Sequence, residues 1–382
     1  MIGRDGDTSS ASCYVNEKGK HVAKTLTVST ETTWPRLGLR PLALLGMLAV
    51  LSGAFVLSLA FGSVRIPLDQ VLTIVFGGEA ARATWPTIVY DFRLPKALTA
   101  TLAGAALGVS GLQMQTLFRN PLADPFVLGV SSGASLGVAL VILTVGAANT
   151  TLLAVAGLLG NLSLVVAACL GAGAVLALVL TLARRVQSSV TLLILGLMIG
   201  YLTSAVVSLL LYFSIAERIQ SYINWSFGSF GGVTWGQLRI LAPTILLGLL
   251  LAFTLTKALN ALLLGETYAQ SMGVNIRRAR VGIVAGSAVL AGAVTAFCGP
   301  ISFLGIAVPH LCRALLRSAD HRILLPATAM VGAACALFAD LAAQAPGANV
   351  VLPLNAITAL IGAPVVVWII LRRGVGRGAF GA

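Results

Sequence analysis

Residues 93–137 read RLPKALTATLAGAALGVSGLQMQTLFRNPLADPFVLGVSSGASLG, and this stretch indicates the fold class. It opens with two cations beside a proline and continues as an apolar segment long enough to cross a bilayer. The segment breaks at Asn120-Pro121 and Asp124-Pro125, and apolar sequence then resumes on glycines. We therefore predict a hairpin of two membrane-spanning helices.

Glycines recur every four residues on both predicted helices. Gly104 and Gly108 lie on the first helix, and Gly129, Gly133 and Gly137 lie on the second. Glycine stripes of this kind let two helix backbones approach closely within a membrane. Both helices are therefore expected to pack against protein.

Two amide side chains lie within the first predicted helix, where lipid would make them costly. One alternative is that they face a protein interior or a wet pathway, and the other is that they form an ordinary helix contact with satisfied amides. The run is Gln113, Met114 and Gln115.

The composition of the whole chain restricts its class. Of its 382 residues, 58% are hydrophobic and only 10% are charged, whereas a soluble domain carries about a quarter charged residues. Its mean hydropathy is +0.96.

The net charge of the chain is +13. Its cations lie between apolar segments, where they set the orientation of the chain in the membrane, so nucleic-acid binding is rejected. The cysteines are scattered without CxxC spacing and are interpreted as small packing residues.

Hydropathy predicts an all-α integral membrane protein with about ten spans. Residues 1–40 are expected to form a polar cytosolic tail, residues 41–373 a ten-span transmembrane domain, and residues 374–382 a second cytosolic tail. Lys and Arg accumulate in alternate loops, which favours both termini in the cytosol. The opposite side keeps only Arg65, Arg82, Arg93, Lys96, Arg218 and Arg239.

Catalytic motifs are absent from the sequence. It contains no GxxxxGK[ST] phosphate loop, no HExxH and no paired carboxylates inside the spans, so we expect no enzyme activity, bound cofactor or metal. Asp340 is the main ionisable group within a span. Either it is a helix-end carboxylate bonded to neighbouring backbone, or it is an ion relay.

Several long motifs, in order, resemble the FecCD-type permeases, the membrane subunits of bacterial ABC importers for iron-siderophores, haem and vitamin B12. The resemblance runs from about residue 45 to the C-terminus. The motifs are LPKALTATLAGAALGVSGLQMQTLFRNPLADPFVLGVSSGA, LLGETYAQSMGV, GPISFLGIAVPHLCR followed by DHRILLP, and LPLNAITALIGAPVVVWIILRR.

The resemblance implies a type II ABC importer permease in the bacterial cytoplasmic (inner) membrane. Such a permease forms a homodimer around a central pathway and works with two separate ATPase subunits, which bind the ATP and Mg. It receives substrate from a periplasmic or lipid-anchored binding protein. Among the substrates, the resemblance favours an iron chelate, siderophore or haem, over vitamin B12. The alternative from another functional class is an ion-coupled secondary carrier. This alternative is disfavoured because few ionisable residues lie within the predicted spans.

The resemblance also assigns roles to residues. Arg93 and Lys96 match the outer basic pair that receives acidic residues of the binding protein, and interfacial anchoring is the alternative. Ser189 and Val190 fall where the family places its inner gate. The ATPase-coupling element, within about residues 260–278, matches Leu264, Gly265, Glu266, Ala269, Gln270, Met272 and Gly273.

Other positions are interpreted as structural or depart from the family pattern. His310 follows Pro309 within a motif shared irrespective of substrate, and we interpret it as structural. Asn355 stands where the family often has Gly, and Gln344 lies where the vitamin B12 permease has an Arg. These departures concern how the binding protein docks.

Overall fold

The computed structural model describes residues 13–15, 21–23, 39–62, 64–144, 160–186, 188–344 and 351–374. The chain divides into two units, Met1–Leu42 and Ala43–Ala382. In the first unit two short strands, β1 (Cys13–Val15) and β2 (His21–Ala23), pair antiparallel. Every other described element is helical. The predicted tail 374–382 lies outside the described residues except for Gly374, and the locations of both tails stay predictions.

Seven helical segments among the described residues are long and apolar enough to cross a bilayer. They are α1 (Leu39–Ala60), the segment formed by α3 (Thr84–Thr87), η1 (Ile88–Arg93) and α4 (Leu94–Leu117), α7 (Gly160–Arg185), α8 (Ser189–Tyr212), α10 (Trp235–Thr254), α13 (Ile276–Cys298) and α15 (His321–Ala343). Three shorter apolar segments are α5 (Val130–Ala139) with η3 (Leu140–Thr144), α14 (Leu304–Leu316) and α16 (Leu354–Gly374). Together they match the expected count of about ten, so the all-α membrane fold is confirmed.

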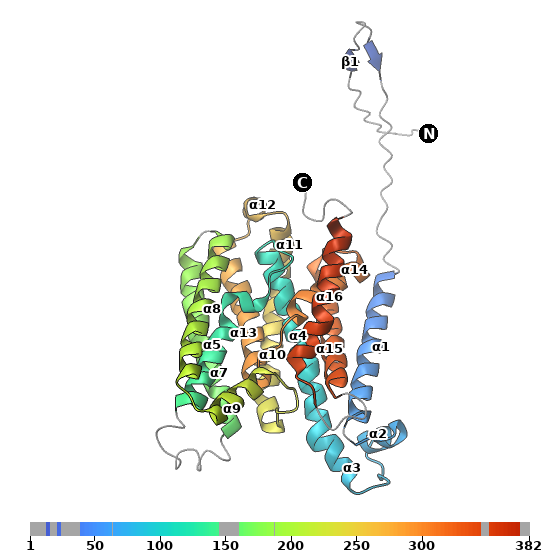
Figure 1. The fold of residues 1–382 in the computed structure, drawn as a ribbon. Helices are drawn as coiled ribbons and strands as arrows, with labels where there is room; N and C mark the ends of the chain where they lie inside the picture. Colours follow the sequence, from blue (N-terminus) through green and yellow to red (C-terminus); the bar gives the residue numbers. More distant parts are fainter. Residues whose placement is uncertain are drawn as a thin grey trace, which may run out of the picture. The chain divides into compact units, whose positions relative to one another are not determined.

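Short helices lie at the two ends of the second unit. Figure 1 shows α11 and α12 at one end, called here the α12 end, and α9 at the opposite end, called the α9 end. The short helices at these ends are α2 (Leu68–Val75), α9 (Ala216–Ser226), α11 (Thr256–Leu263) and α12 (Glu266–Ser271), whereas η2 (Pro125–Leu128) lies in the connection between α4 and α5. Helix α4 runs from the α9 end towards the α12 end, and α15 runs in the opposite direction (Figure 1).

Helix α4 lies in the centre of the second unit, and most of its residues are buried. It packs on α15 through glycine: a Cβ at Gly104 would overlap the carbonyl of Gly332. One turn further, a Cβ at Gly108 would lie 2.9 Å from the Thr328 carbonyl oxygen. Such close backbone contact between helices depends on the absence of a side chain. Glycine therefore fixes the separation of α4 and α15.

The second glycine stripe lies on α5 and faces α7. A Cβ at Gly133 would lie 2.6 Å from the Gly171 carbonyl oxygen, and one at Gly137 would overlap the carbonyl of Ala167. Gly129 starts the helix with a φ of +75°, a conformation that favours glycine. Just before it, Asp124 caps η2 by accepting a hydrogen bond from Phe126 N at 2.9 Å. The hairpin connection is thus built from local caps.

Candidate functional site

Arg93 lies at the α9 end, and its side chain is turned inward. Its Nη1 donates to the carbonyl oxygens of Leu59 (2.6 Å) and Ala60 (2.8 Å), and Nη2 donates to the Val64 carbonyl. Leu59 and Ala60 end α1, where carbonyls lack helical partners and a cation is favourable. Arg93 is only 8% exposed. It therefore holds the end of α1 in place.

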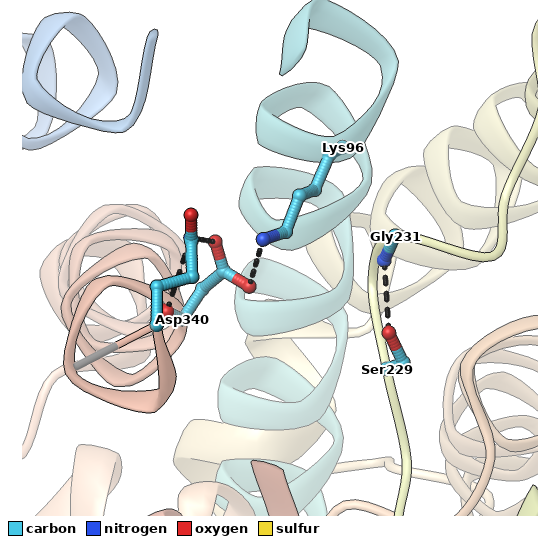
Figure 2. A network of polar contacts seen from close by, with 5 residues as sticks. Lys96, Ser229, Gly231 and Asp340 are labelled. Atoms are coloured by element: carbon cyan, nitrogen blue, oxygen red, sulfur yellow. Dashed lines mark hydrogen bonds and ion pairs between the residues drawn. The ribbon is translucent and has the colours of Figure 1, made fainter. Parts of the chain in front are cut away.

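Lys96, three residues further on, forms an ion pair between two helices. Its Nζ lies 2.9 Å from Asp340 Oδ1 on α15, and the two side chains are 20% and 6% exposed. Gln344 Nε2 donates to the other Asp340 oxygen at 2.8 Å. Figure 2 shows this pair beside the segment that contains Ser229 and Gly231. Asp340 is thus not bonded only to neighbouring backbone, because its principal partner is a cation on another helix.

Both residues of the expected docking pair therefore already have partners within the protein. Sequence reasoning placed Arg93 and Lys96 together on one outward face. The structure directs Arg93 to α1 and Lys96 to α15. A signal for the ion pair was present in the sequence, since Lys96 and Asp340 are charges of opposite sign within apolar segments. Docking by these residues stays a prediction.

At the other end, the expected coupling element forms a short helix bounded by glycines. Gly265 precedes α12 with a φ of +107°, and Gly273 follows it with a φ of +84°. Val274 N donates to the Ala269 carbonyl at 3.0 Å, which closes the C-terminal turn as in a glycine-capped helix. Ala269 is fully buried. The helix is thus fixed at both ends and anchored through one face.

Large apolar side chains at α12 and at its two ends are exposed to the surroundings. Leu264, Tyr268 and Met272 are spaced by four residues and are 61%, 56% and 59% exposed. Tyr268 lies within α12, whereas Leu264 and Met272 lie just before and just after it. Several large exposed apolar side chains gathered at one short segment are typical of an interaction site.

A buried arginine connects α12 to the end of α7. Arg280, on α13, is 3% exposed, and its Nη2 lies 2.9 Å from Glu266 Oε1 in the first turn of α12. Its Nη1 donates to the Val186 carbonyl at 2.7 Å. These residues line a cleft of about 760 Å³ that also contains the exposed side chains of Arg184 and Arg185. Sequence reasoning assigned Arg280 no individual role.

The expected inner-gate residues stand at the start of α8. Ser189 is its first residue, and Ser188 caps the helix by accepting a hydrogen bond from Thr191 N at 3.3 Å. Val190 is 62% exposed. The structure thus places these residues three and four positions after Val186, and the gate role stays a prediction.

The two interior amides of α4 have different surroundings. Gln115 Oε1 accepts from Arg313 Nη1 at 2.6 Å, and Gln115 Nε2 donates to the Ile306 carbonyl at 3.2 Å. Gln113 is fully buried, and neither of its amide atoms has a hydrogen-bond partner within the described part of the chain. Met114 is also fully buried. Gln115 is therefore a satisfied helix contact, whereas Gln113 is a buried amide facing the protein interior.

Two histidines take part in polar contacts near the α12 end. His310 Nε2 lies 2.8 Å from the Pro121 carbonyl oxygen, so it ties α14 to the hairpin connection. His321 lies between Thr116 Oγ1 on α4 and Asn260 Oδ1 on α11, with both distances 2.8 Å. No group of three or more His, Cys, Asp or Glu that could hold a metal occurs among the described residues.

Comparison with known proteins identifies the family. Residues 48–372 match the model of the FecCD transport family. The hemin transport system permease protein HmuU of Yersinia pestis is 38% identical over 340 residues, which cover 87% of this chain and 97% of that protein. The vitamin B12 import system permease protein BtuC of Escherichia coli is 36% identical over 319 residues, which cover 82% and 94%.

A solved structure, described as an inward-facing conformation of a metal-chelate type ABC transporter, has the same fold. It matches with a TM-score of 0.75 and 30% sequence identity, covering 87% of this chain and 99% of that one. The expected ABC importer permease architecture is therefore confirmed. The family match spans the described helices from α1 to α16, and so the chain belongs to the FecCD transport family.

Proposed function

We propose that this chain is the membrane-spanning permease subunit of a binding-protein-dependent importer that carries an iron chelate, a siderophore or haem, across the bacterial inner membrane. The observation that carries the proposal is the family match over residues 48–372. HmuU, named for hemin transport, and BtuC, named for vitamin B12 import, are similar to this chain over comparable lengths. Vitamin B12 is therefore the alternative cargo within the same class.

The α12 end is proposed to face the cytosol and to bind the ATPase. The exposed side chains of Leu264, Tyr268 and Met272 support this, because they offer apolar area at a short helix bounded by Gly265 and Gly273. Basic residues in the loops and helix ends there agree with the positive-inside rule. They are Arg119, Arg184, Arg185, Lys257, Arg277, Arg278, Arg280, Arg313, Arg317 and Arg322.

The remaining parts of the proposal follow the family. Two copies of the chain form the pathway, two ATPase subunits supply ATP hydrolysis with Mg, and a binding protein docks at the α9 end near Arg93 and Lys96. Ser189 and Val190 form the inner gate. An ion-coupled carrier is disfavoured, because Asp340, the main ionisable group within a span, is already paired with Lys96 and Gln344.

Reconstitution tests the proposal. The permease is placed in proteoliposomes with its ATPase and binding protein, and uptake of ferric siderophore, haem and vitamin B12 is measured with and without ATP. Uptake of an iron chelate that requires both ATP and the ATPase is expected. Uptake driven by a pH or sodium gradient without the ATPase would contradict the proposal of an ATP-driven importer. Uptake of vitamin B12 but of no iron chelate would contradict the proposed cargo.

A further inference from the structure

Arg280 contacts two segments that the proposed mechanism treats as separate. Its guanidinium lies 2.9 Å from Glu266 Oε1 and 2.7 Å from the Val186 carbonyl oxygen, and its side chain is 4% exposed. A guanidinium presents several N–H donors in a fixed planar fork, so both contacts are made by one rigid group. A displacement at one contact is thus transmitted to the other.

Each contact lies next to the end of a helix. Glu266 is the first residue of α12, the helix with exposed apolar side chains. Val186 directly follows α7, and α8 begins at Ser189. Only two residues separate Val186 from Ser189, so the Val186 carbonyl lies close along the chain to the start of α8.

The surrounding charges favour the contact with Glu266. The cleft of about 760 Å³ is also lined by Arg184, Arg185 and Arg277, and Glu266 is the carboxylate among its lining residues. A buried guanidinium that lost this carboxylate would face like charges in a medium less polar than water, which is strongly unfavourable. Arg280 is therefore expected to follow Glu266 when α12 moves.

We propose that Arg280 is a positioning residue that transmits movement of α12 to the beginning of α8, and so couples the ATPase to the inner gate. The inference rests on the proposed function, and it adds a physical connection that the family resemblance does not supply. When the ATPase displaces α12, Glu266 carries Arg280 with it, and the hydrogen bond from Nη1 shifts the Val186 carbonyl. The gate residues Ser189 and Val190 move as a result.

The test compares variants of Arg280 in the reconstituted complex of permease, ATPase and binding protein. Arg280→Gln removes the charge, and Arg280→Lys keeps the charge but replaces the planar fork with a single ammonium group. Arg278→Gln is the matched control, because Arg278 lies two residues earlier on α13 and is exposed. The measured quantities are ATP hydrolysis, substrate imported per ATP, and thermal stability.

Both Arg280 variants are expected to hydrolyse ATP within about twofold of the wild-type rate. Their import per ATP should fall at least about tenfold, the scale of one lost charge-assisted hydrogen bond. The double variant Glu266→Gln with Arg280→Gln should be no worse than Arg280→Gln alone, because both changes break one connection. Arg278→Gln should leave import per ATP unchanged.

A gate readout separates transmission from a merely structural role. In a Val190→Cys background, the rate of thiol labelling is measured with and without ATP, and the same chain without that change gives the background from native thiols. With Arg280 present, the rate of thiol labelling at position 190 should depend on ATP. Arg280→Gln should abolish this dependence while ATP is still hydrolysed.

Two results would overturn the inference. One is unchanged import per ATP in both Arg280 variants, and the other is a loss of import that only parallels loss of folded protein, with ATP-dependent labelling intact. If the unmodified complex imports no substrate with ATP, the proposed function fails first. The two failures are therefore distinguishable.

Discussion

Lys96 Nζ lies 2.9 Å from Asp340 Oδ1, which joins the first turn of α4 to the last turn of α15 at the α9 end. The carboxylate is almost fully covered, and Gln344 donates to its second oxygen. Removing one partner of a covered ion pair leaves the other charge uncompensated, whereas replacing both by apolar groups is far less costly. This asymmetry gives a direct test of what the pair contributes.

Lys96→Met should lower the free energy of unfolding by about 3 kcal/mol, because the carboxyl of Asp340 is then left largely buried without its cationic partner. The double variant Lys96→Met with Asp340→Leu should recover most of this loss. Thermal unfolding in one detergent, followed for both variants and each single change, measures the coupling. Equal destabilisation by the single and double variants would show that the pair carries no coupling energy.

A second prediction concerns docking of the binding protein. Its association rate should change in opposite directions when Lys96 or Asp340 is substituted. If Lys96 attracts an acidic surface, Asp340→Asn frees it and should raise the association rate, whereas Lys96→Gln should lower it. Both effects should shrink at high salt, because rim charges act mainly through screened attraction. Arg239→Gln, at another exposed cation near the α9 end, is the matched control. Association rates that both variants leave unchanged would remove Lys96 from the docking surface.

The exposed apolar side chains at α12 predict where the ATPase binds. Tyr268→Asp should weaken binding of the ATPase roughly thirtyfold, about 2 kcal/mol, since a charge replaces an aromatic side chain in an apolar contact. Tyr268→Phe keeps the apolar area and should bind within about twofold of wild type. Affinity is measured with the purified permease and ATPase. Equal affinity of the Asp and Phe variants would contradict the assignment of this segment.

Asp124 predicts a pH dependence of stability. Burial raises the pKa of its carboxyl from 3.8 to about 6, and the hydrogen bond from Phe126 N opposes this shift. The folded state therefore binds a proton that the unfolded chain has released, so stability should fall as the pH rises from about 4 to 6. Asp124→Asn should raise the free energy of unfolding by about 3 kcal/mol at pH 7 and have little effect near pH 4. A difference between variant and wild type that does not change with pH would contradict this.

The sequence predicted the fold well, because the membrane restricts the chain to helices and hydropathy marks them. The hairpin of α4 and α5 was visible in the glycine spacing and in the breaks at Asn120-Pro121 and Asp124-Pro125. The family motifs predicted positions for the coupling element and the gate, and both roles stay predictions. The boundaries of α12 at Gly265 and Gly273 agree with the expected glycine-bounded helix.

The sequence did not predict the partners of the charged residues. Arg93 binds the end of α1, Lys96 binds Asp340, and Arg280 joins Glu266 to Val186. All these contacts join separate segments, and only the tertiary arrangement sets which side chains meet. Spacing along one helix could place Arg93 and Lys96 on a face, but it carried no information about what lies opposite.

The glycine contact between α4 and α15 has a consequence for biosynthesis. Helix α4 buries most of its surface, yet its partner begins at His321, about 200 residues after Leu117, which takes roughly 10 to 40 s to synthesise. During that interval the Gly104 face has no α15 to pack on. Nascent chains that stop before α15 should therefore present an unmatched small-residue groove to the insertion machinery, and they should be cleared faster than chains that stop after it.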